Sequence, residues 1–226
     1  MTLPNPKESV APAQKRRVIK LGGSLFDLPN LVDRLLCLVR HWPDMANFVV
    51  VGGGPAADMV RNWDDAWGLG EIRRHHLSIF AMNWNAKQIF KHHSAFHTVR
   101  NTRSIPENLK LAVVFAEPFL NSQAASSNRN AVPASRHITS DSIAAYVADI
   151  LYAEQLVMCK SLDCFSNVDR TSVGHQRDFD HHLIDVSSTQ QLQSIAERGL
   201  VDREFPKYAA KVPVVSWCNF RQWALR

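Results

Sequence analysis

The sequence predicts an α/β fold with a mainly parallel central sheet, and three observations lead to this prediction. Short apolar runs alternate along the chain with longer segments of helical periodicity, which is the pattern of parallel strands joined by crossover helices. Two of the apolar runs end in glycine turns that precede helical segments. With 46% apolar residues, the 226-residue chain can also bury a sheet between helices.

The length fits one domain or at most two small ones. Residues 1–16 carry three prolines and little periodicity, so we predict a flexible N-terminal tail followed by a single domain over residues 17–226. No apolar run approaches the roughly 20 residues that a membrane-spanning helix needs. The first residues also lack the apolar core of a signal peptide. We therefore expect a cytoplasmic protein that makes no membrane contact.

Strands and helices alternate in a regular order. The predicted strands cover residues 17–21, 47–51, 111–116, 156–158 and 212–215, and the predicted helices cover residues 29–41, 56–67, 71–91, 139–151 and 188–198. Thr139 fits the N-cap of the fourth helix, with Asp141 in its first turn. Residues 121–137 are rich in Ser, Asn and Ala and are predicted to form a long loop, which is often a lid or a binding loop.

The first predicted strand ends in a feature suited to an anion. Val18, Ile19 and Leu21 are strand-forming residues, and Gly22 and Gly23 follow them. A glycine turn lets a ligand approach the backbone closely, and a following helix would direct free N–H groups and its positive end toward that ligand. Lys20 adds a full positive charge.

A second copy of this arrangement follows. The strand at residues 47–51 leads into Gly52, Gly53 and Gly54, and Pro55 suits the first turn of a helix. Two glycine turns that each precede a helix, at the ends of two strands of one small sheet, predict two phosphate-binding sites. A phosphoryl transfer needs a donor site and an acceptor site close together, so this pairing favours a kinase.

Three segments taken together resemble the amino acid kinase family, which includes acetylglutamate, aspartate, uridylate and isopentenyl phosphate kinases. They are Val18-Ile19-Lys20-Leu21-Gly22-Gly23-Ser24, Val51-Gly52-Gly53-Gly54 and Ile138-Thr139-Ser140-Asp141-Ser142-Ile143-Ala144-Ala145. The resemblance implies a three-layer α/β/α sandwich, ATP and magnesium as cofactors, a small-molecule substrate and a homodimer or larger homo-oligomer. It implies no metal site made by protein side chains alone.

The resemblance also implies roles for individual residues. Lys20 and Asp141 would be catalytic, with Asp141 holding Lys20 in position. The ATP phosphates would be contacted by Gly22, Gly23, Ser24, Lys160 and Asp163, and the acceptor by Gly52, Gly53, Gly54, Arg61 and Ser140. Such a set suits phosphoryl transfer, which asks for alignment and charge neutralisation rather than covalent chemistry by the protein. Simpler roles remain possible for three of these residues. Asp141 could serve just to complement its helix dipole, Lys160 could lie at the solvent-exposed edge of a strand, and Asp163 could be a turn residue.

A narrower resemblance points to the short branch that contains aminomethylfuran phosphate kinases. It rests on residues 52–61, on Ala81-Met82, on Val132-Pro133-Ala134-Ser135 ahead of Thr139, and on Leu200-Val201-Asp202-Arg203-Glu204-Phe205-Pro206. The branch implies a phosphate monoester as acceptor. The chain departs from the family at Cys164, where a glycine is expected, and from the branch at Ser135-Arg136-His137. These departures keep open a catalytically weakened nucleotide- or oxyanion-binding protein of the same fold.

Other classes of protein fit the sequence less well. Gly52, Gly54 and Ala57 match a loose dinucleotide fingerprint, which leaves a dinucleotide-binding oxidoreductase as a further alternative. The net charge of +5 is scattered and not interleaved with aromatics, so it indicates an anionic small substrate rather than a nucleic acid. The four cysteines fit buried, reduced thiols. We expect the paired histidines at 75–76, 92–93 and 181–182 to lie on solvated helix surfaces, and Trp63, Trp67 and Trp84 to lie in the core or at a subunit interface.

Overall fold

A computed structural model of the chain, described here over residues 14–125, 131–164 and 184–223, contains one seven-stranded sheet. The strand order is β3-β4-β2-β1-β5-β7-β6, and β6 is the single antiparallel strand within this described part. The strands are β1 (Arg16–Leu21), β2 (Ala46–Val51), β3 (His97–Val99), β4 (Leu111–Val114), β5 (Gln155–Lys160), β6 (Ile184–Asp185) and β7 (Val214–Asn219).

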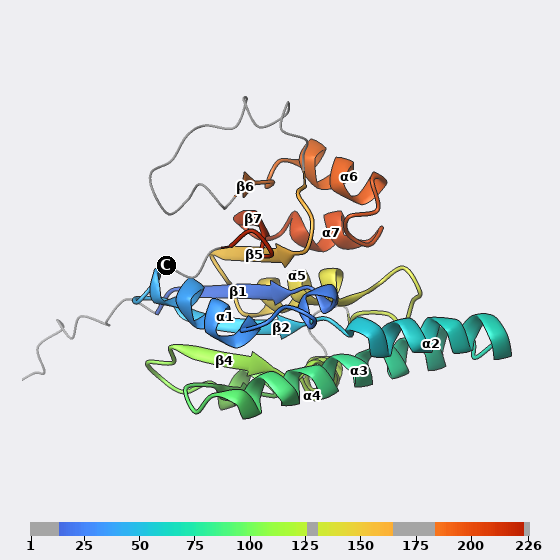
Figure 1. Cartoon of the computed structure of the whole chain (residues 1–226), viewed down its shortest axis with the longest axis horizontal. Helices are drawn as coiled ribbons and strands as arrows, with labels where there is room; N and C mark the ends of the chain where they lie inside the picture. The colour runs from blue at the N-terminus through green and yellow to red at the C-terminus, as the bar shows by residue number, and fades with distance from the viewer. Residues whose placement is uncertain (1–13, 126–130, 165–183, 224–226) are drawn as a thin grey trace, which may run out of the picture.

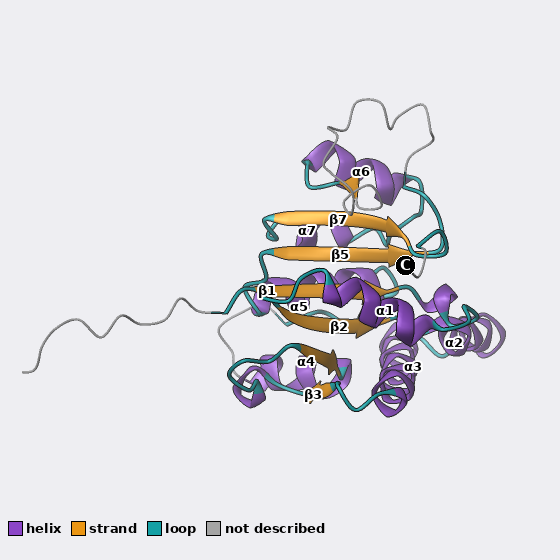
Figure 2. Ribbon diagram, turned by 60° about the vertical axis from the view of Figure 1, so that its left-hand side comes forward, coloured by secondary structure: helices purple, strands orange, loops and turns teal. Residues whose placement is uncertain are grey.

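Helices cover both faces of this sheet (Figures 1 and 2). The α-helices are α1 (Leu31–Arg40), α2 (Gly54–Trp67), α3 (Glu71–His92), α4 (Ala116–Ala125), α5 (Ser140–Ile150), α6 (Thr189–Glu197) and α7 (Phe205–Ala209). Two short 3-10 turns, η1 (Gly23–Leu25) and η2 (Thr102–Ser104), complete the set. One core cluster joins the sheet to α5 and α7, and the other joins its opposite face to α1. The predicted three-layer α/β/α sandwich is confirmed.

The central strand β1 is buried because it pairs in parallel with β2 on one side and with β5 on the other. Successive side chains of a strand point to opposite faces of the sheet. Val18 accordingly belongs to the core on the α5 face, whereas Ile19 and Leu21 belong to the core on the α1 face. This alternation places Lys20 on the α5 face.

Several element boundaries differ from the prediction. The sequence analysis missed β3, whose three residues are too few for a recognisable pattern. It also assigned residues 121–137 to a loop, but residues 121–125 form the end of α4. Ser and Asn in that stretch are weak helix formers, and packing of Phe119 in the core holds the helix nonetheless. Residues 126–130 lie outside the described residues.

At the start of the described chain, Gln14 donates a hydrogen bond to the Leu109 carbonyl (2.7 Å), and β1 begins at Arg16. Cys159, Cys164 and Cys218 are buried, and none of the four cysteines forms a disulfide. Across the described ranges, no helix combines the length and the hydropathy needed to cross a bilayer.

Candidate active site

The two glycine turns touch each other. Because β1 and β2 are adjacent and parallel, with Leu21 opposite Val51, the turns that follow them lie at the same edge of the sheet. A Cβ added to Gly23 would lie 2.2 Å from the backbone nitrogen of Gly54 and 2.5 Å from its Cα. A Cβ added to Gly52 would lie 2.6 Å from the nitrogen of Gly23. The turns therefore meet backbone to backbone, which only glycine permits.

The segments that follow the two turns differ from each other. Helix α2 starts at Gly54 itself, with Pro55 in its first turn as predicted. The first turn instead continues into η1, and α1 begins only at Leu31, after Asn30 in a left-handed conformation (φ 58°). The expectation of a helix N-terminus directly at Gly22 and Gly23 is wrong. Only the second turn lies at the positive end of an α-helix.

A buried carboxylate joins two lysines beside these turns. The Nζ of Lys20 lies 2.6 Å from Asp141 Oδ1, and the side chains are 3% and 7% exposed. Lys160, at the end of β5, places its Nζ 2.9 Å and 2.8 Å from the two oxygens of the same carboxylate. Both lysines reach Asp141 because strand alternation directs them to the face that α5 covers.

The charges of this trio shift one another's pKa values. Burial lowers the pKa of Lys20 to about 8, with a further contribution from the charge of Lys160 and against the attraction of Asp141. Burial by itself would raise the pKa of Asp141, but Lys160 and Lys20 outweigh it and lower this pKa to about 2. At neutral pH Asp141 therefore carries its negative charge and Lys20 its positive charge.

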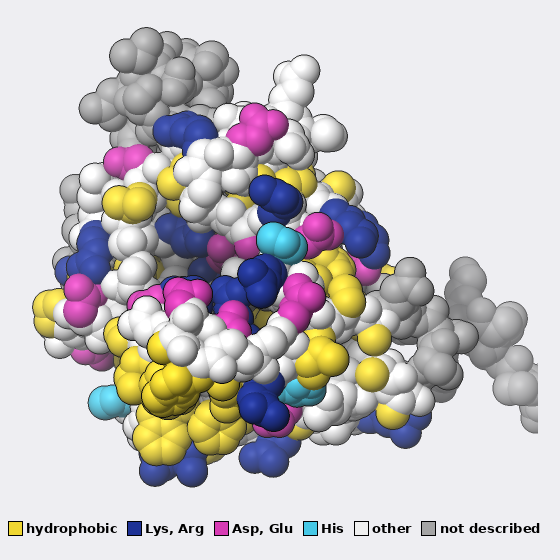
Figure 3. Space-filling model, turned by 90° about the vertical axis from the view of Figure 1, so that its right-hand side faces the viewer, with side chains coloured by type: hydrophobic (Ala, Val, Ile, Leu, Met, Phe, Trp, Pro, Cys, Tyr) yellow, Lys and Arg dark blue, Asp and Glu magenta, His cyan; other side chains and the backbone are white. Residues whose placement is uncertain are grey.

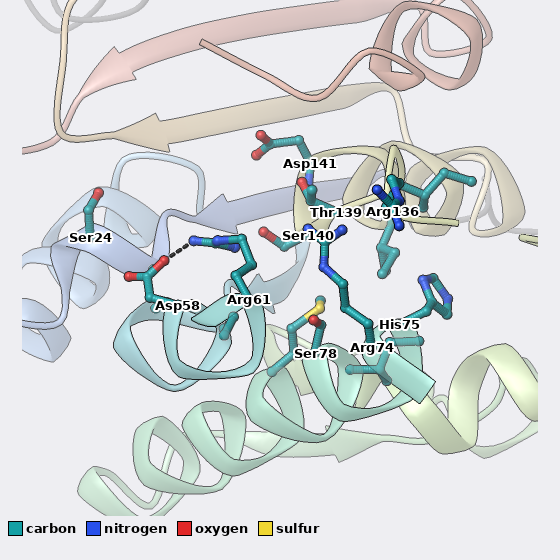
Figure 4. A pocket seen from close by; sticks show the side chains of 18 of the residues that line it. Ser24, Asp58, Arg61, Arg74, His75, Ser78, Arg136, Thr139, Ser140 and Asp141 are labelled. Carbon is teal, nitrogen blue, oxygen red and sulfur yellow. Dashed lines mark hydrogen bonds and ion pairs between the residues drawn. The ribbon is translucent and has the colours of Figure 1, made fainter. Parts of the chain in front are cut away.

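A cavity of about 330 Å³ opens next to the trio. Its lining includes the trio, Gly23, Ser24, Gly53 and Gly54, together with side chains from α2, α3 and the start of α5. Figure 3 shows this hollow ringed by basic and acidic side chains, and Figure 4 shows the residues around it.

Three arginines converge on the far half of the cavity. Arg61 comes from α2, Arg74 from α3 and Arg136 from the segment before α5 (Figure 4). Partial burial and the nearby charge of Arg74 both lower the pKa of Arg61. Each of the two helical arginines has an acidic neighbour, Asp58 for Arg61 and Asp64 for Arg74 at 3.7 Å. The apolar part of this half is formed by Ile79, Met82, Ile138 and Ile143.

Most of the predicted site residues line this cavity. They are Lys20, Gly23, Ser24, Gly53, Gly54, Arg61, Ser140, Asp141 and Lys160. Gly22, Gly52 and Asp163 do not line it. Gly22 packs against β5, where its N–H donates to the Cys159 carbonyl (2.9 Å), and Gly52 lies beneath the contact between the turns. Asp163 lies beyond the end of β5.

The sequence analysis missed Arg74, His75 and Ser78 of α3, and gave Arg136 no role. His75 was expected on a solvated surface but is buried, and burial lowers its pKa, so it is neutral at neutral pH. His76 and the pair at 92–93 are exposed as expected, and the pair at 181–182 lies outside the described residues. The helical spacing of residues 75, 78, 79 and 82 is the signal that could have placed this face of α3 toward the site.

Two other expectations can be compared with the structure. Cys164 has no positive φ and its side chain is buried, so the departure from glycine does not strain this turn. A dinucleotide site needs a strand after α2 that ends in an acid for the ribose. Here α3 follows α2, and the next strand, β3, is separated from β2 by β4. The dinucleotide-binding alternative therefore lacks the strand that would carry the ribose-binding acid.

Comparison with known proteins gives matches among solved structures alone. No family model and no curated sequence matches the chain. The uridylate kinase of Archaeoglobus fulgidus is 16% identical over 89% of each chain, with a TM-score of 0.55. The UMP kinases of Ureaplasma parvum and Bacillus anthracis are 11% and 13% identical over 93% of this chain and 89% of theirs, with TM-scores of 0.57 and 0.54. The chain therefore has the fold of these uridylate and UMP kinases.

Proposed function

We propose that this protein is an ATP-dependent kinase of the amino acid kinase family that transfers the γ-phosphoryl group to a small anionic metabolite. The observation that carries the proposal is the buried Lys20–Asp141–Lys160 trio beside two glycine turns in contact. A transferring phosphoryl group spreads negative charge over its oxygens, and fixed cations and backbone dipoles stabilise that charge. The kinases that share this fold support the same reading.

The two halves of the cavity take different parts in this proposal. Lys20, Lys160 and the turn at Gly22–Ser24 would receive the phosphates of ATP, which supplies the phosphoryl group. The turn at Gly52–Gly54, with Arg61 and Ser140, would hold the acceptor in line with it. Asp141 would fix the direction of both ammonium groups and would not itself exchange a proton, because its pKa is about 2.

The residues present fit a nucleotide phosphate chain. Gly23, Gly53 and Gly54 line the cavity, and because they carry no side chain a phosphate can approach their backbone closely. Over the described ranges, no group of three or more His, Cys, Asp or Glu side chains could hold a metal ion. Magnesium would therefore be bound through the phosphates of ATP and would neutralise part of their charge.

Three arginines and an apolar wall indicate the class of acceptor. Guanidinium groups recognise phosphate or carboxylate by two parallel hydrogen bonds. Partial burial and, after it, the nearby charge of Arg74 lower the pKa of Arg61, and a bound anion would offset the repulsion between these two arginines. Ile79 and Met82 offer the rest of the molecule an apolar surface. A phosphate monoester with a small apolar body, such as an aminomethylfuran phosphate, fits best, and a carboxylate is the second choice.

The test is to incubate the protein with ATP, magnesium and a panel of phosphate monoesters, UMP and amino acids. Turnover is measured as ADP release, and the product is identified by phosphorus NMR. Calorimetry with ATP runs beside it. Turnover with an anionic acceptor supports the proposal. Binding of ATP without turnover of any acceptor would instead support a catalytically weakened nucleotide-binding protein. Absence of ATP binding would overturn both.

Arg74→Ala is expected to raise the KM for the acceptor at least about tenfold and to leave the KM for ATP within about twofold, because Arg74 faces only the acceptor half of the cavity. Loss of one charged hydrogen-bond partner, at about 1.5–3 kcal/mol, corresponds to such a change. Steady-state kinetics with each substrate varied in turn measures it. The neighbouring Arg73 is exposed and does not line the cavity, so Arg73→Ala is the matched control. Equal effects of the two variants would contradict the assignment.

We also propose that the cytoplasmic enzyme is a homodimer that pairs through the outer face of α2 and α3. Trp67, Ile72, Phe80, Trp84 and Met59 are 70%, 67%, 60%, 55% and 52% exposed, and Trp63 stacks on Trp67. On α2 these residues recur every four positions (59, 63 and 67), and on α3 they are spaced by eight and by four (72, 80 and 84), so each set lies along one side of its helix. We call the two sets together the apolar patch. Hydrophobic side chains gather below the hollow in Figure 3, where these helices lie.

Charge favours a second copy as the occupant of this patch. Outside the cavity and its ion pairs, α2 carries an exposed aspartate, Asp65, whereas α3 carries three exposed basic residues, Arg73, Lys87 and Lys91. In an interface with two-fold symmetry, α2 of one copy can lie against α3 of the other, so that opposite charges flank a shared apolar centre.

Phe80→Asp with Trp84→Asp is therefore expected to convert a species of twice the 25.5 kDa chain mass into a monomer, as measured by sedimentation velocity. Tyr152→Asp, an equally exposed aromatic residue outside the patch, should leave the mass unchanged. A monomeric wild type would refute the homodimer without affecting the kinase proposal.

A further inference from the structure

The segment at residues 200–206 places one carboxylate against the start of α5, more than 50 residues away in sequence. Asp202 Oδ2 accepts hydrogen bonds from the backbone N–H of Thr139 (3.0 Å), from its hydroxyl (2.8 Å) and from the N–H of Ser142 (3.0 Å). Asp202 Oδ1 accepts from the hydroxyl of Ser142 and from the N–H of Glu204 (3.2 Å). Five donors thus converge on a single side chain.

These bonds hold the first turn of α5 on both sides of Asp141. Thr139 is the N-cap, and its hydroxyl oxygen also accepts from the N–H of Asp141 (3.4 Å). Since Thr139 and Ser142 are both attached to Asp202, the backbone that carries Asp141 cannot shift without breaking charge-assisted hydrogen bonds. A negative charge at this position also complements the positive end of the helix.

The segment that carries Asp202 is itself fixed in the core. Val201 and Phe205 are 5% and 0% exposed, and α7, which begins at Phe205, packs against α5. The carboxylate is therefore supported by a rigid element and not by a free loop. The hydrogen bonds of Asp202 therefore fix the start of α5 relative to this segment.

We infer that Asp202 is a positioning residue of the proposed phosphoryl transfer, which holds Asp141 at the distance where it pairs with both Lys20 and Lys160. This inference depends on the proposed function for its kinetic consequence, but the placement itself can be measured without turnover. Asp141 lies 2.6–2.9 Å from the two ammonium groups. A displacement of about 1 Å at such a site can cost about 100-fold in rate.

The occupied helix start has a second consequence. The N–H groups of Thr139 and Ser142 are bound to Asp202, so they are not offered to an anion in the cavity. A phosphate at the N-terminus of α5 would also lie against the carboxylate of Asp202. The acceptor anion is thereby directed to Arg61, Arg74 and Arg136, which line the same cavity.

The kinetic test is a double-mutant cycle between Asp202→Asn and Asp141→Asn. Asparagine has the shape of aspartate but lacks its charge and one acceptor oxygen. Asp202→Asn is expected to lower kcat about 10- to 100-fold with the KM for ATP within about threefold. In the Asp141→Asn background the same change should alter kcat by less than about twofold, because Asp202 acts through Asp141. Independent, multiplicative losses would overturn the inference.

A direct readout is the titration of Lys20, followed by NMR of its side-chain Cε in protein with labelled lysine. Asp141 raises the pKa of Lys20, so Asp141→Asn should lower it below its value in the wild type. Asp202→Asn should lower it in the same direction by part of that amount. The charged groups that act on Lys20 are Asp141 and Lys160, and both remain in the Asp202 variant. An unchanged Lys20 titration in Asp202→Asn would refute the inference, even for a protein without kinase activity.

Ser188→Ala is the matched control, because it removes the N-cap of α6, where the Ser188 hydroxyl accepts from the N–H of Gln191 (3.2 Å). It should lower stability by about 1 kcal/mol, as caps do, and leave both kcat and the Lys20 titration unchanged. If Asp202→Asn does not fold, Ser142→Ala removes a single bond to Asp202 and serves as the milder variant. A Lys20 shift in Ser188→Ala as large as in the Asp202 or Ser142 variant would mean that the effect is general loosening.

Discussion

Lys20→Met is expected to lower kcat about 100- to 1000-fold while the protein stays folded. The side chain of Lys20 is 3% exposed and lines the cavity, where the proposed reaction develops negative charge. Methionine retains most of the apolar stem. Asp141 keeps Lys160 as a partner at 2.8 Å, so no unpaired buried carboxylate remains. Rapid-quench measurement of product formation determines the rate.

The control for this change is Lys15→Met, which removes an exposed lysine paired with Glu154 (3.1 Å). A surface ion pair contributes little to stability, so both rate and stability should stay near those of the wild type. Circular dichroism of the Lys20 variant separates a loss of chemistry from a loss of fold. Retention of more than about a tenth of the wild-type rate would remove Lys20 from its proposed role.

The same ammonium group predicts the pH dependence of the wild type. Burial lowers the pKa of Lys20 to about 8, so most of the cation is present below about pH 7 and it is lost as the pH rises through 8. The value of kcat/KM, which reports on the free enzyme, should therefore fall about tenfold per pH unit above 8. In Lys20→Arg, whose guanidinium stays charged, the remaining activity should show no decline near pH 8.

Gly23→Ala is expected to destabilise the fold by about 1–3 kcal/mol, the usual range for overpacking, and to lower kcat about 100-fold. The new methyl group would lie 2.2 Å from the nitrogen and 2.5 Å from the Cα of Gly54, and backbone atoms cannot rotate away. The two turns must separate, which changes the distance between the proposed donor and acceptor sites. Chemical denaturation and steady-state kinetics measure the two effects.

Gly199→Ala separates this contact effect from the general cost of replacing glycine. Gly199 has φ 70° and nothing within 4 Å of an added Cβ, so its substitution adds backbone strain without a clash. It should cost about 1 kcal/mol of stability and leave kcat unchanged. A Gly23 variant that loses stability but keeps its full rate would show that contact between the turns does not matter for catalysis.

Much of the donor half of the site could be predicted from the sequence. Strand alternation places Lys20 with Val18, and Lys160 with Leu156 and Met158, on one face of the sheet. Thr139 marks the helix start, so Asp141 falls in its first turn. The glycines identify turns that need close backbone approach. These features can be read from local hydrophobic patterns, with a period of two residues in strands and of 3.6 residues in helices.

In the acceptor half, Arg61, Ser140, Gly53 and Gly54 were predicted, but the contributions of α3 and of Arg136 were not. Arg74, His75 and Arg136 reach the cavity because α3 packs beside α2 and because Glu71 accepts hydrogen bonds from Ser135 and Arg136. In sequence, His75 and His76 look alike, yet one is buried and the other exposed. Which face of a long helix turns inward depends on its neighbours, and those are distant along the chain.

The sequence by itself determined the α/β class, the parallel strands and the two glycine turns, because each of these depends on local propensity and periodicity. The roles of Lys20, Asp141 and Lys160 came from the resemblance to the amino acid kinase family, which the ordered motifs of the sequence carry. The tertiary structure alone decided that the turns touch, that one carboxylate pairs with two lysines, that three arginines face them and that Asp202 anchors α5. Most of these contacts join segments that lie far apart in the sequence, such as Lys20 with Asp141 and Asp202 with Thr139. The order of the strands in the sheet and the packing of the helices determine these contacts, and neither can be read from a short-range pattern in the sequence.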